Sequence, residues 1–408
     1  MPIFKAVEPN KKFSTVFTVS ITIITNIYIT HIKVRKEKIM KIIVNKEDMK
    51  TAVTKVIGAV SAKSVISAIE GILLKSFGNT LFLAGYDLEM GITATIPASV
   101  EREGEVIFPA KLLLEMLTRL DSENVFFDMD DKCMCTIVGG KTQYNIIGIN
   151  AEEFPDLPSV SVDNAVTLSQ GEVRDMIAQT FFAIAQNEQR PVHMGSKFDI
   201  KNGYFNLISV DGFRMAVCRR KIEGDEKKSF VVPRKTLNEL MKILSDDYDE
   251  KMSINISKKH IIFEIENYTV ISRLLEGDFI DYERAIPSSW ETEVRINRRI
   301  FIECFERVNI ITEEKLINPV KLTFRDNSVQ IECTTAVGKI KESLPAKIEG
   351  KDIEIGFNNR YLLDALKNCK NDEVIVCLNS PESSAKIIPP DSDDYTMLVL
   401  PMRLNKYE

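Results

Sequence analysis

The chain has 408 residues, with 53 lysines and arginines against 59 aspartates and glutamates, which gives a formal net charge of −6. This acidic balance argues against a protein that wraps nucleic acid over its whole surface, although it permits a basic stripe on an acidic body. Hydrophobic residues make up 44% and charged residues 27% of the chain, as in soluble globular proteins. The length predicts two or three domains rather than a single core.

The first 39 residues differ in composition from the rest of the chain. Residues 13–30, FSTVFTVSITIITNIYIT, carry no charge and are rich in Thr, Ile and Val. Polar residues dilute this run and no small-residue cleavage site follows it, so we favour an aggregation-prone extension outside the fold over a membrane span or a signal segment. Met40 is then the expected start of the folded protein, and we predict no membrane association.

Three stretches share one apolar pattern: VIFPAKLLLEMLTRL (106–120), FVVPRKTLNELMKIL (230–244) and, more weakly, EIGFNNRYLLDALKNC (354–369). Their markers Pro109, Pro233 and Asn358 are 124 and 125 residues apart, and Asp87 and Asp211 are also separated by 124. Such regular spacing predicts three homologous domains of about 125 residues. We place the boundaries at 1–39 for the extension and at 40–166, 167–291 and 292–408 for the three domains.

Each repeat predicts the same elements in the same order. Residues 46–60, 169–184 and 297–311 carry apolar side chains at helical spacing, and Ser169 and Asn297 are good N-cap residues. A second helix follows each Pro or Asn marker, with alternating strands before and after it. We therefore expect an α+β fold in which each domain packs two helices on about eight antiparallel strands.

The expected helices carry a partial charge bias. In residues 234–242, Arg234, Lys235 and Lys242 outnumber Glu239. A solvated helix face explains any single case, but repetition across most of the six helices favours a weakly basic surface.

The seven cysteines are scattered along the chain and form no C-x-x-C pair. We interpret them as reduced thiols of a cytoplasmic protein that pack as small core side chains. Cys133 and Cys135 would share one face of a strand, which favours packing over metal binding. Since His31, His193 and His260 are the only histidines, we expect no zinc site and no cofactor.

The sequence contains no convincing catalytic motif. IVGGKT (137–142) ends like a phosphate-binding loop, but Cys135 stands where the first glycine is needed. DMDDK (128–132) lacks the turn glycine of a calcium loop and has Gly139 at its twelfth position. Catalysis is therefore not expected. Two alternatives stay open: a metal-dependent nucleotide-processing enzyme that uses the carboxylates of DMDDK or of DSDDY (391–395), and a repeat scaffold that binds only proteins.

VDGFRMAV (210–217) and VLPMRL (399–404), together with the three repeats, resemble the bacterial DNA polymerase III beta subunit family, the sliding clamps. The resemblance runs from Met40 to Leu404. It implies a non-catalytic processivity factor for DNA replication: a head-to-tail homodimer of three-domain chains that forms a ring around duplex DNA without sequence preference. It also implies that short linear peptides of the DNA polymerase III alpha subunit, the clamp loader and other repair polymerases bind the ring.

In this family, the Asp-Gly hairpin forms one wall of a hydrophobic cleft between the second and third domains, and the peptides insert there. Gly212 would permit the turn, methionine and leucine would offer adaptable apolar surface, and Arg214 would anchor backbone or acidic groups of the peptide. The resemblance assigns the following cleft residues: His193, Val210, Gly212, Phe213, Arg214, Met215, Ile280, Arg284, Ala285, Asn358, Tyr361, Ser384, Leu398, Val399, Leu400, Pro401, Met402, Arg403 and Leu404.

The same residues also permit a plainer interpretation, in which Met215, Leu400 and Met402 merely fill the core between two domains. The sibling repeats argue against it, because Leu88-Glu89-Met90 and Val337-Gly338-Lys339 stand where Phe213-Arg214-Met215 would be. The shared fold therefore does not require the arginine.

The resemblance also implies a DNA-facing surface and two subunit edges. Twelve helices spaced about 10 Å apart would line a circle roughly 38 Å across, which leaves room for water around a duplex. At the subunit contact, the strand around Tyr144 and Ile146 would meet Ile310 and Ile311 of a second copy. The assigned DNA-binding residues are Lys63, Lys111, Asn187, Arg190, Arg234 and Lys235.

Several positions depart from the family pattern. His193 stands where the family usually has leucine, and Ile280 stands where it has proline, so the cleft should differ in shape and polarity. Residues 405–408 extend past the usual terminal leucine. The segment KSVISAIEG (63–71) replaces a pattern richer in proline and leucine, which weakens the assignment of Lys63.

Overall fold

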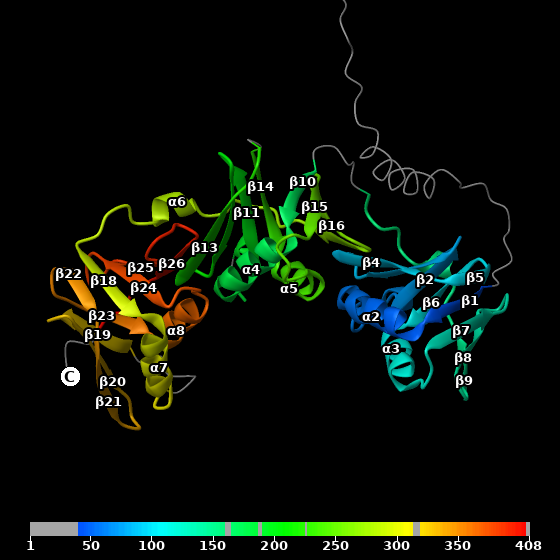
Figure 1. Ribbon diagram of the computed structural model, residues 1–408, viewed down its shortest axis with the longest axis horizontal. Coiled ribbons are helices and arrows are strands. Elements are labelled where there is room, and N and C mark those ends of the chain that lie inside the picture. Colours follow the sequence, from blue (N-terminus) through cyan, green and yellow to red (C-terminus); the bar gives the residue numbers. More distant parts are fainter. Residues whose placement is uncertain (1–39, 160–164, 187–189, 225–226, 313–318, 405–408) are drawn as a thin grey trace, which may run out of the picture.

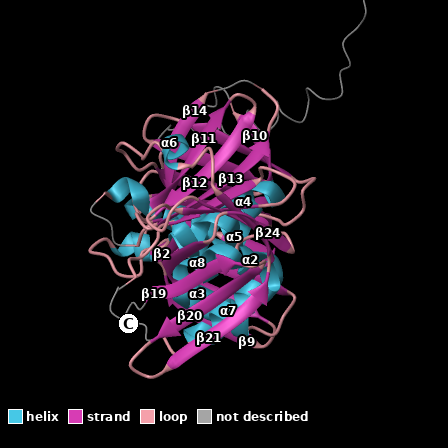
Figure 2. Ribbon diagram, turned by 90° about the vertical axis from the view of Figure 1, so that its left-hand side faces the viewer, coloured by secondary structure: helices cyan, strands magenta, loops and turns pink. Residues whose placement is uncertain are grey.

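The computed structural model describes residues 40–159, 165–186, 190–224, 227–312 and 319–404. These residues form three α+β units in a row that bends into an open arch (Figure 1). Each unit turns two helices toward the concave side of the arch, and its sheets form the outer side. Viewed along the arch, most helices of the three units overlap near the middle of the picture, with strands above and below them (Figure 2). The sequence prediction of three repeated α+β domains is confirmed.

The first unit contains β1 (Lys41–Asn45), α2 (Lys46–Val56), β2 (Gly71–Phe77), β3 (Thr80–Tyr86), β4 (Met90–Pro97), β5 (Ser99–Arg102), β6 (Gly104–Pro109), α3 (Ala110–Arg119), β7 (Asn124–Met129), β8 (Met134–Gly139) and β9 (Thr142–Ile147). The second contains β10 (Val166–Ser169), α4 (Gln170–Thr180), β11 (Gly195–Lys201), β12 (Tyr204–Val210), β13 (Arg214–Lys221), β14 (Lys228–Pro233), α5 (Arg234–Ile243), β15 (Lys251–Ile256), β16 (His260–Ile265), β17 (Tyr268–Arg273) and α6 (Tyr282–Ala285). The third contains β18 (Thr292–Asn297), α7 (Arg298–Asn309), β19 (Pro319–Arg325), β20 (Ser328–Thr334), β21 (Lys339–Pro345), β22 (Lys347–Gly350), β23 (Ile353–Asn358), α8 (Asn359–Lys367), β24 (Glu373–Leu378), β25 (Ala385–Ile388) and β26 (Tyr395–Val399).

The first helix of each unit begins at a side-chain cap. Asn45, Ser169 and Asn297 each accept a hydrogen bond from a backbone N–H in the first turn, which satisfies a donor that the helix itself cannot pair. The predicted caps Ser169 and Asn297 are confirmed. Pro109 and Pro233 end strands β6 and β14, and the helices α3 and α5 start immediately after them.

Two antiparallel sheets cross the boundaries between units. Strand β4 of the first unit pairs with β17 of the second in an eight-stranded sheet, and β13 of the second pairs with β26 of the third in a nine-stranded sheet. The two remaining sheets lie at the ends of the arch and have five and four strands, with β9 and β21 as one edge of each. The units are thus joined by shared sheets rather than by loops alone.

The main apolar core runs continuously through all three units. Its cross-boundary pairs are fully buried: Ile92 lies opposite Val270, and Ala216 lies opposite Met397. Burying a large aliphatic side chain contributes roughly 1.5–3 kcal/mol, so these pairs stabilise the junctions as they would stabilise the interior of one domain.

The seven cysteines are unpaired and buried, as the sequence predicted. Burial raises the pKa of the Cys218 and Cys377 thiols to about 12, which makes them poor nucleophiles. In the part of the chain that the structure describes, no helix is both long and apolar enough to cross a bilayer.

Candidate functional sites

The predicted hairpin lies between β12 and β13. The N–H groups of Phe213 and Arg214 each donate to Asp211 Oδ1 at 3.0 Å, and Gly212 has a φ of +86°, which an L side chain rarely adopts. This capped turn holds the Phe213 side chain 57% exposed at its tip. The Phe213 ring stacks on Tyr361 of α8, with centroids 5.7 Å apart and an interplanar angle of 28°. The turn of the second unit therefore touches the third.

Arg214 lies directly behind this turn, and only 11% of its side chain is exposed. Its Nε is 2.9 Å from Asp211 Oδ2, and a terminal guanidinium nitrogen is 2.6 Å from Asp364 Oδ2 on α8. The guanidinium also lies 4.6 Å from the Tyr361 ring centroid and 5.2 Å from that of Phe182. In the single chain, Asp211 and Asp364 therefore pair with its charged group and link the two units. Its expected role as a peptide anchor stays a prediction.

The structure divides the predicted cleft residues into a buried floor and an exposed rim. Val210, Met215 and Leu398 are at most 6% exposed and belong to a small apolar cluster, separate from the main core, on the outer face of the nine-stranded sheet. Met215 is therefore buried in the single chain, and its place in the cleft stays a prediction. Phe213, Leu400 and Ile280, in contrast, are 57%, 45% and 38% exposed.

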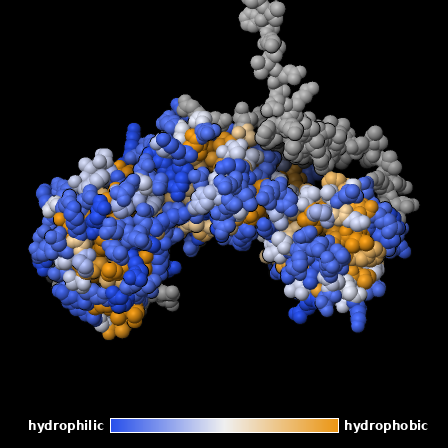
Figure 3. Space-filling model, in the orientation of Figure 1, coloured by the Kyte–Doolittle hydropathy of each residue, from blue (hydrophilic) through white to orange (hydrophobic). Residues whose placement is uncertain are grey.

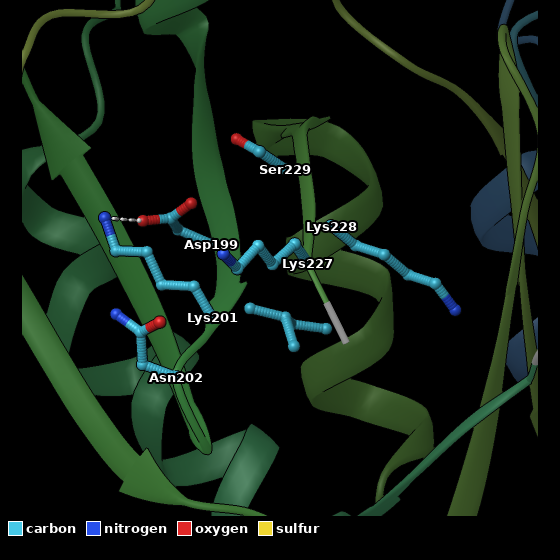
Figure 4. A pocket seen from close by; sticks show the side chains of 7 residues that line it. Asp199, Lys201, Asn202, Lys227, Lys228 and Ser229 are labelled. Atoms are coloured by element: carbon cyan, nitrogen blue, oxygen red, sulfur yellow. Dashed lines mark ion pairs between the residues drawn. The ribbon is translucent and has the colours of Figure 1, made fainter. Parts of the chain in front are cut away.

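Helix α6 closes one side of this cluster. The Tyr282 hydroxyl donates to Asp199 Oδ2 at 2.6 Å, and Lys201 Nζ lies 2.9 Å from the same oxygen and 3.0 Å from Glu283 Oε1. Burial, with Asp199 beside the hydroxyl, raises the pKa of Tyr282. Figure 4 shows Asp199 and Lys201 in a shallow pocket of about 290 Å³ on the outer side of the second unit, with Lys227 among its other lining residues. The Asp199 contacts fix α6 on the sheet.

The other predicted residues near α6 differ in exposure. Arg284 is almost fully exposed and pairs with Asp281 at 3.1 Å, and Ala285 is exposed. His193 is buried and contacts Phe279 edge-on, with ring centroids 5.4 Å apart.

The chain's last described segment follows β26 and crosses from the second unit to the third. The Leu400 N–H donates to the Phe213 carbonyl at 2.8 Å, and the Met402 N–H donates to the Gly356 carbonyl at 2.7 Å. Val399 is fully buried, Pro401, Met402 and Leu404 are half-buried, and Arg403 is exposed.

The remaining cleft predictions, Asn358 and Ser384, lie at the edge of this region. The Asn358 side chain accepts a hydrogen bond from the Arg360 N–H at 2.9 Å as the cap of α8, and Ser384 is half-buried before β25. Sequence reasoning missed Asp364 as the partner of Arg214. The signal was present, since Asp364 lies three residues after Tyr361 and shares its helix face.

The concave side of the arch is lined by helices with a basic bias. Helices α2, α3, α5, α7 and α8 each contain more Lys and Arg than Asp and Glu, whereas α4 does not. The chain as a whole has a net charge of −6, so these five helices are more basic than the rest of the chain.

The predicted DNA-binding residues differ in their exposure and in whether their charged groups already have ion-pair partners. Lys63, Lys111 and Arg190 are exposed, and Lys235 is exposed but forms an ion pair with Asp87 of the first unit. Asn187 lies outside the described residues.

Arg234, also predicted to bind DNA, has close contacts within the chain. It is half-buried, donates to the carbonyls of Phe181 and Ile184 at 3.3 and 3.1 Å, and lies 4.2 Å from the Phe181 ring centroid. Burial, with a smaller contribution from Arg214, lowers the pKa of Arg234. These contacts support the end of α4, and the DNA contact of Arg234 stays a prediction.

The two ends of the arch each present a strand edge and apolar side chains. On β9, Tyr144 and Ile146 are half-buried and Ile147 is 66% exposed. At the opposite end, Ile310 is 80% exposed just after α7, and Ile311 is half-buried. In Figure 3, hydrophobic colour gathers at the lower tip of the third unit, below α7.

The acidic runs of the alternative enzyme hypothesis serve other contacts. Asp128 pairs with Arg102 at 2.6 Å, and Asp130 Oδ1 accepts two backbone hydrogen bonds within its own turn. Asp393 pairs with Arg219 at 2.8 Å. Among the described residues, no group of three or more His, Cys, Asp or Glu side chains is placed to hold a metal ion.

Three units joined by shared sheets, with helices inside and strands outside, define a three-domain clamp fold. Family models of the DNA polymerase III beta subunit match its N-terminal domain at residues 40–158, its central domain at 167–281 and its C-terminal domain at 283–403. The chain therefore belongs to the DNA polymerase III beta subunit family, the beta sliding clamps. Members of this family are non-catalytic processivity subunits of the replicative polymerase.

Named relatives support the same assignment. The chain is 32% identical over 356 residues to a beta sliding clamp of Staphylococcus epidermidis, covering 85% of this chain and 94% of the relative. It is 30% identical over 375 residues to that of Staphylococcus aureus, covering 89% and 99%.

Solved structures agree in fold. A DNA polymerase III beta subunit from Eubacterium rectale superimposes with a TM-score of 0.86 at 31% identity, covering 89% of this chain and 99% of that one. The DNA polymerase sliding clamp of Bacillus subtilis gives a TM-score of 0.87 at 27% identity, covering 90% and 100%. A Pseudomonas aeruginosa sliding clamp bound to griselimycin gives 0.85 at 26% identity, covering 90% and 100%.

Proposed function

We propose that two copies of this chain join head to tail into a ring that encircles duplex DNA and tethers the replicative polymerase. The observation that carries this proposal is the pair of incomplete sheets at the ends of the arch. Joined edge to edge, the five-stranded and four-stranded sheets make nine strands, the number in the sheet that joins the second and third units. An unpaired strand at the edge of a sheet can pair with a strand of another chain. Each contact between the two copies would cover one such edge on each copy.

The repeats also supply the register of this contact. Ile92, Ala216 and Ile340 follow one another at intervals of 124 residues, and the first two lie opposite the third residue of β17 and of β26. The third residue of β9 is Tyr144, so Ile340 would lie opposite Tyr144 of the partner subunit.

A backbone hydrogen bond supports the same register. Arg273 donates to the Glu89 carbonyl and Leu400 donates to the Phe213 carbonyl, both at 2.8 Å. The third equivalent would run from Ile147 of the partner subunit to Val337, two residues that are 66% and 69% exposed in the single chain.

The ring would stay on DNA because it encircles the duplex, without the need for high-affinity contacts. The basic bias of the inner helices attracts phosphates weakly, and few contacts of this kind allow the ring to slide. Lys63, Lys111, Arg190, Arg234 and Lys235 remain the proposed contacts, and Asn187 remains proposed from the sequence alone.

The cleft between the second and third domains is the proposed site for linear peptides of the polymerase III alpha subunit, the clamp loader and repair polymerases. Exposed Phe213, Leu400 and Ile280, together with the cluster of buried apolar side chains, would suit an apolar peptide anchor. The other assigned residues remain proposed as members of this site. Because the proposed partners act in DNA replication, we also propose that the protein is cytoplasmic. We propose domain boundaries at 40–166, 167–291 and 292–408.

Light scattering at micromolar concentration tests ring closure. We expect the wild-type chain to be a dimer and Ile340→Asp to be a monomer, because a charge would face an apolar side chain across the new sheet. Ile43→Asp is the matched control, since Ile43 is an exposed isoleucine on β1, which lies between β5 and β7 and not at the β9 or β21 edge proposed to pair. A monomeric wild type, or a dimeric Ile340→Asp variant, would contradict the proposed contact.

A further inference from the structure

Gly356 lies in the middle of β23, under the last described segment of the chain. The Met402 N–H donates to its carbonyl at 2.7 Å. A Cβ atom at this position would lie 2.6 Å from the Met402 carbonyl oxygen and 2.8 Å from Leu404 Cδ2. Both distances are shorter than side chains normally tolerate, so the glycine forms a notch that the terminal segment fills.

The backbone itself does not demand glycine here. Gly356 lies in a regular strand, paired with Lys321 of β19, and its φ is not positive. An alanine could therefore adopt the same dihedral angles. Space is the only feature that this glycine supplies.

The equivalent positions of the other two units carry large side chains. Ile107 bridges to Ile149, and Val231 bridges to Leu275, in the same way that Gly356 bridges to Met402. At Gly356, in contrast, no side chain separates the strand from the segment that covers it.

The same segment presents the rim of the proposed cleft. Leu400 is bonded to the Phe213 carbonyl and Met402 to the Gly356 carbonyl, so two hydrogen bonds fix the chain between them across the domain junction. A shift of Met402 away from β23 would move the exposed Leu400 side chain relative to Phe213.

We propose that Gly356 is a positioning residue for peptide binding: its missing side chain sets where the segment from Leu400 to Leu404 lies, and thereby how tightly the cleft holds a peptide. This inference rests on the proposed function of the cleft. It assigns a role to a residue that need not touch the peptide.

The test is a size series at position 356, read by fluorescence anisotropy with a labelled linear peptide of the polymerase III alpha subunit. We expect Gly356→Ala to weaken binding about threefold and Gly356→Val at least tenfold. Glu354→Val is the matched control, because it adds the same side chain to the same face of β23 at an exposed position two residues away. It should bind within twofold of the wild type.

Hydrogen exchange supplies a readout that a general loss of structure would not give. The Met402 amide should exchange faster in Gly356→Val, while the β23 amides that pair with β19 and the dimer by light scattering stay unchanged. If valine prevents folding, the alanine variant carries the same test with one added methyl group.

The outcomes separate the two proposals. A wild-type chain that fails to bind the peptide would reject the cleft itself. Wild-type binding together with equally tight binding by Gly356→Val, or by Gly356→Ala where the valine variant does not fold, would reject the notch and leave the cleft standing.

Discussion

The two junctions inside the chain share one backbone design and differ in their side chains. At the first, Asp87 Oδ1 accepts from the N–H groups of Glu89 and Met90; at the second, Asp211 Oδ1 accepts from those of Phe213 and Arg214. The strand pairing and the cross-boundary backbone hydrogen bond also recur at both junctions.

The side chains then give the two turns different uses. Asp87 pairs with Lys235 across the first junction, and Gly91 after the turn lies against Leu157. Asp211 instead holds Arg214, which reaches Asp364 across the second junction. The comparison teaches that sheet continuity joins the domains at both junctions, whereas the turn residues distinguish the junction with the proposed cleft from the other.

Truncating the chain after Val399 should have the largest effect on this difference. The variant loses Leu400 and the segment that bridges to β23 but keeps all of β26. We expect peptide affinity to fall about 100-fold or more, because an apolar anchor site loses one wall. Anisotropy measures the affinity and light scattering the dimer, which should persist. Unchanged affinity would contradict the location of the cleft.

Arg214→Ala should rank second. It removes a guanidinium that is only 11% exposed and leaves Asp364 without that partner. Hydrogen bonds between charged groups contribute about 1.5–3 kcal/mol, so we expect the free energy of unfolding to fall by about 2 kcal/mol in urea denaturation. Lys351→Ala breaks an exposed pair with Glu291 and should cost less than about 1 kcal/mol. Equal losses in both variants would refute the bracing role of Arg214.

Phe213→Ala and Leu88→Ala sharpen the comparison directly, because each removes the exposed apolar side chain of one of the two equivalent turns. Leu88 itself stands in the place of Gly212, with a φ of +75° against +86°, and Glu89 stands in the place of Phe213. Removing Phe213 deletes its stack on Tyr361, worth about 0.5–1.5 kcal/mol, and an exposed part of the rim. We expect about a tenfold loss of peptide affinity for Phe213→Ala and none for Leu88→Ala in the same anisotropy assay. Similar losses at the two turns would place peptide binding at both junctions.

The smallest expected effect concerns pH at the second junction. Burial alone would raise the pKa of Asp175, but hydrogen bonds from Lys370 and Tyr248 hold it below its ordinary value. A lowered carboxyl pKa contributes stability that is present above the unfolded pKa, near 3.9, and is lost as the pH falls through the folded value. Asp175→Asn should therefore reduce stability slightly at pH 7 and not at pH 2. A loss that is the same at both pH values would refute this linkage.

Most of the fold could be predicted from the sequence because each repeat can be recognised from short stretches of residues. The markers Pro109, Pro233 and Asn358 recur at nearly constant intervals, and Ser169 and Asn297 act as the caps that their types suggest. The Asp-Gly turn could be predicted as well, because two adjacent residues are enough to indicate it.

The contacts of the site could not be predicted, because they join distant parts of the chain. Arg214 and Asp364 are 150 residues apart, so only the packed structure shows that the arginine is already paired. Arg234 similarly donates to the carbonyls of Phe181 and Ile184, about 50 residues earlier in the chain. Met215 is buried in a cluster that includes Tyr282 of α6, and that helix is held by contacts with the distant Asp199 and Lys201, whereas Leu400 is exposed.

Encirclement is tested most directly by loading the protein onto a closed circular plasmid with its clamp loader, isolating the complex by gel filtration, and then cutting the plasmid once. The account predicts that the wild type stays with the circle and leaves the DNA after linearisation, and that Ile340→Asp is not retained at all. Retention that survives linearisation would contradict it, since a ring held by topology slides off a free end.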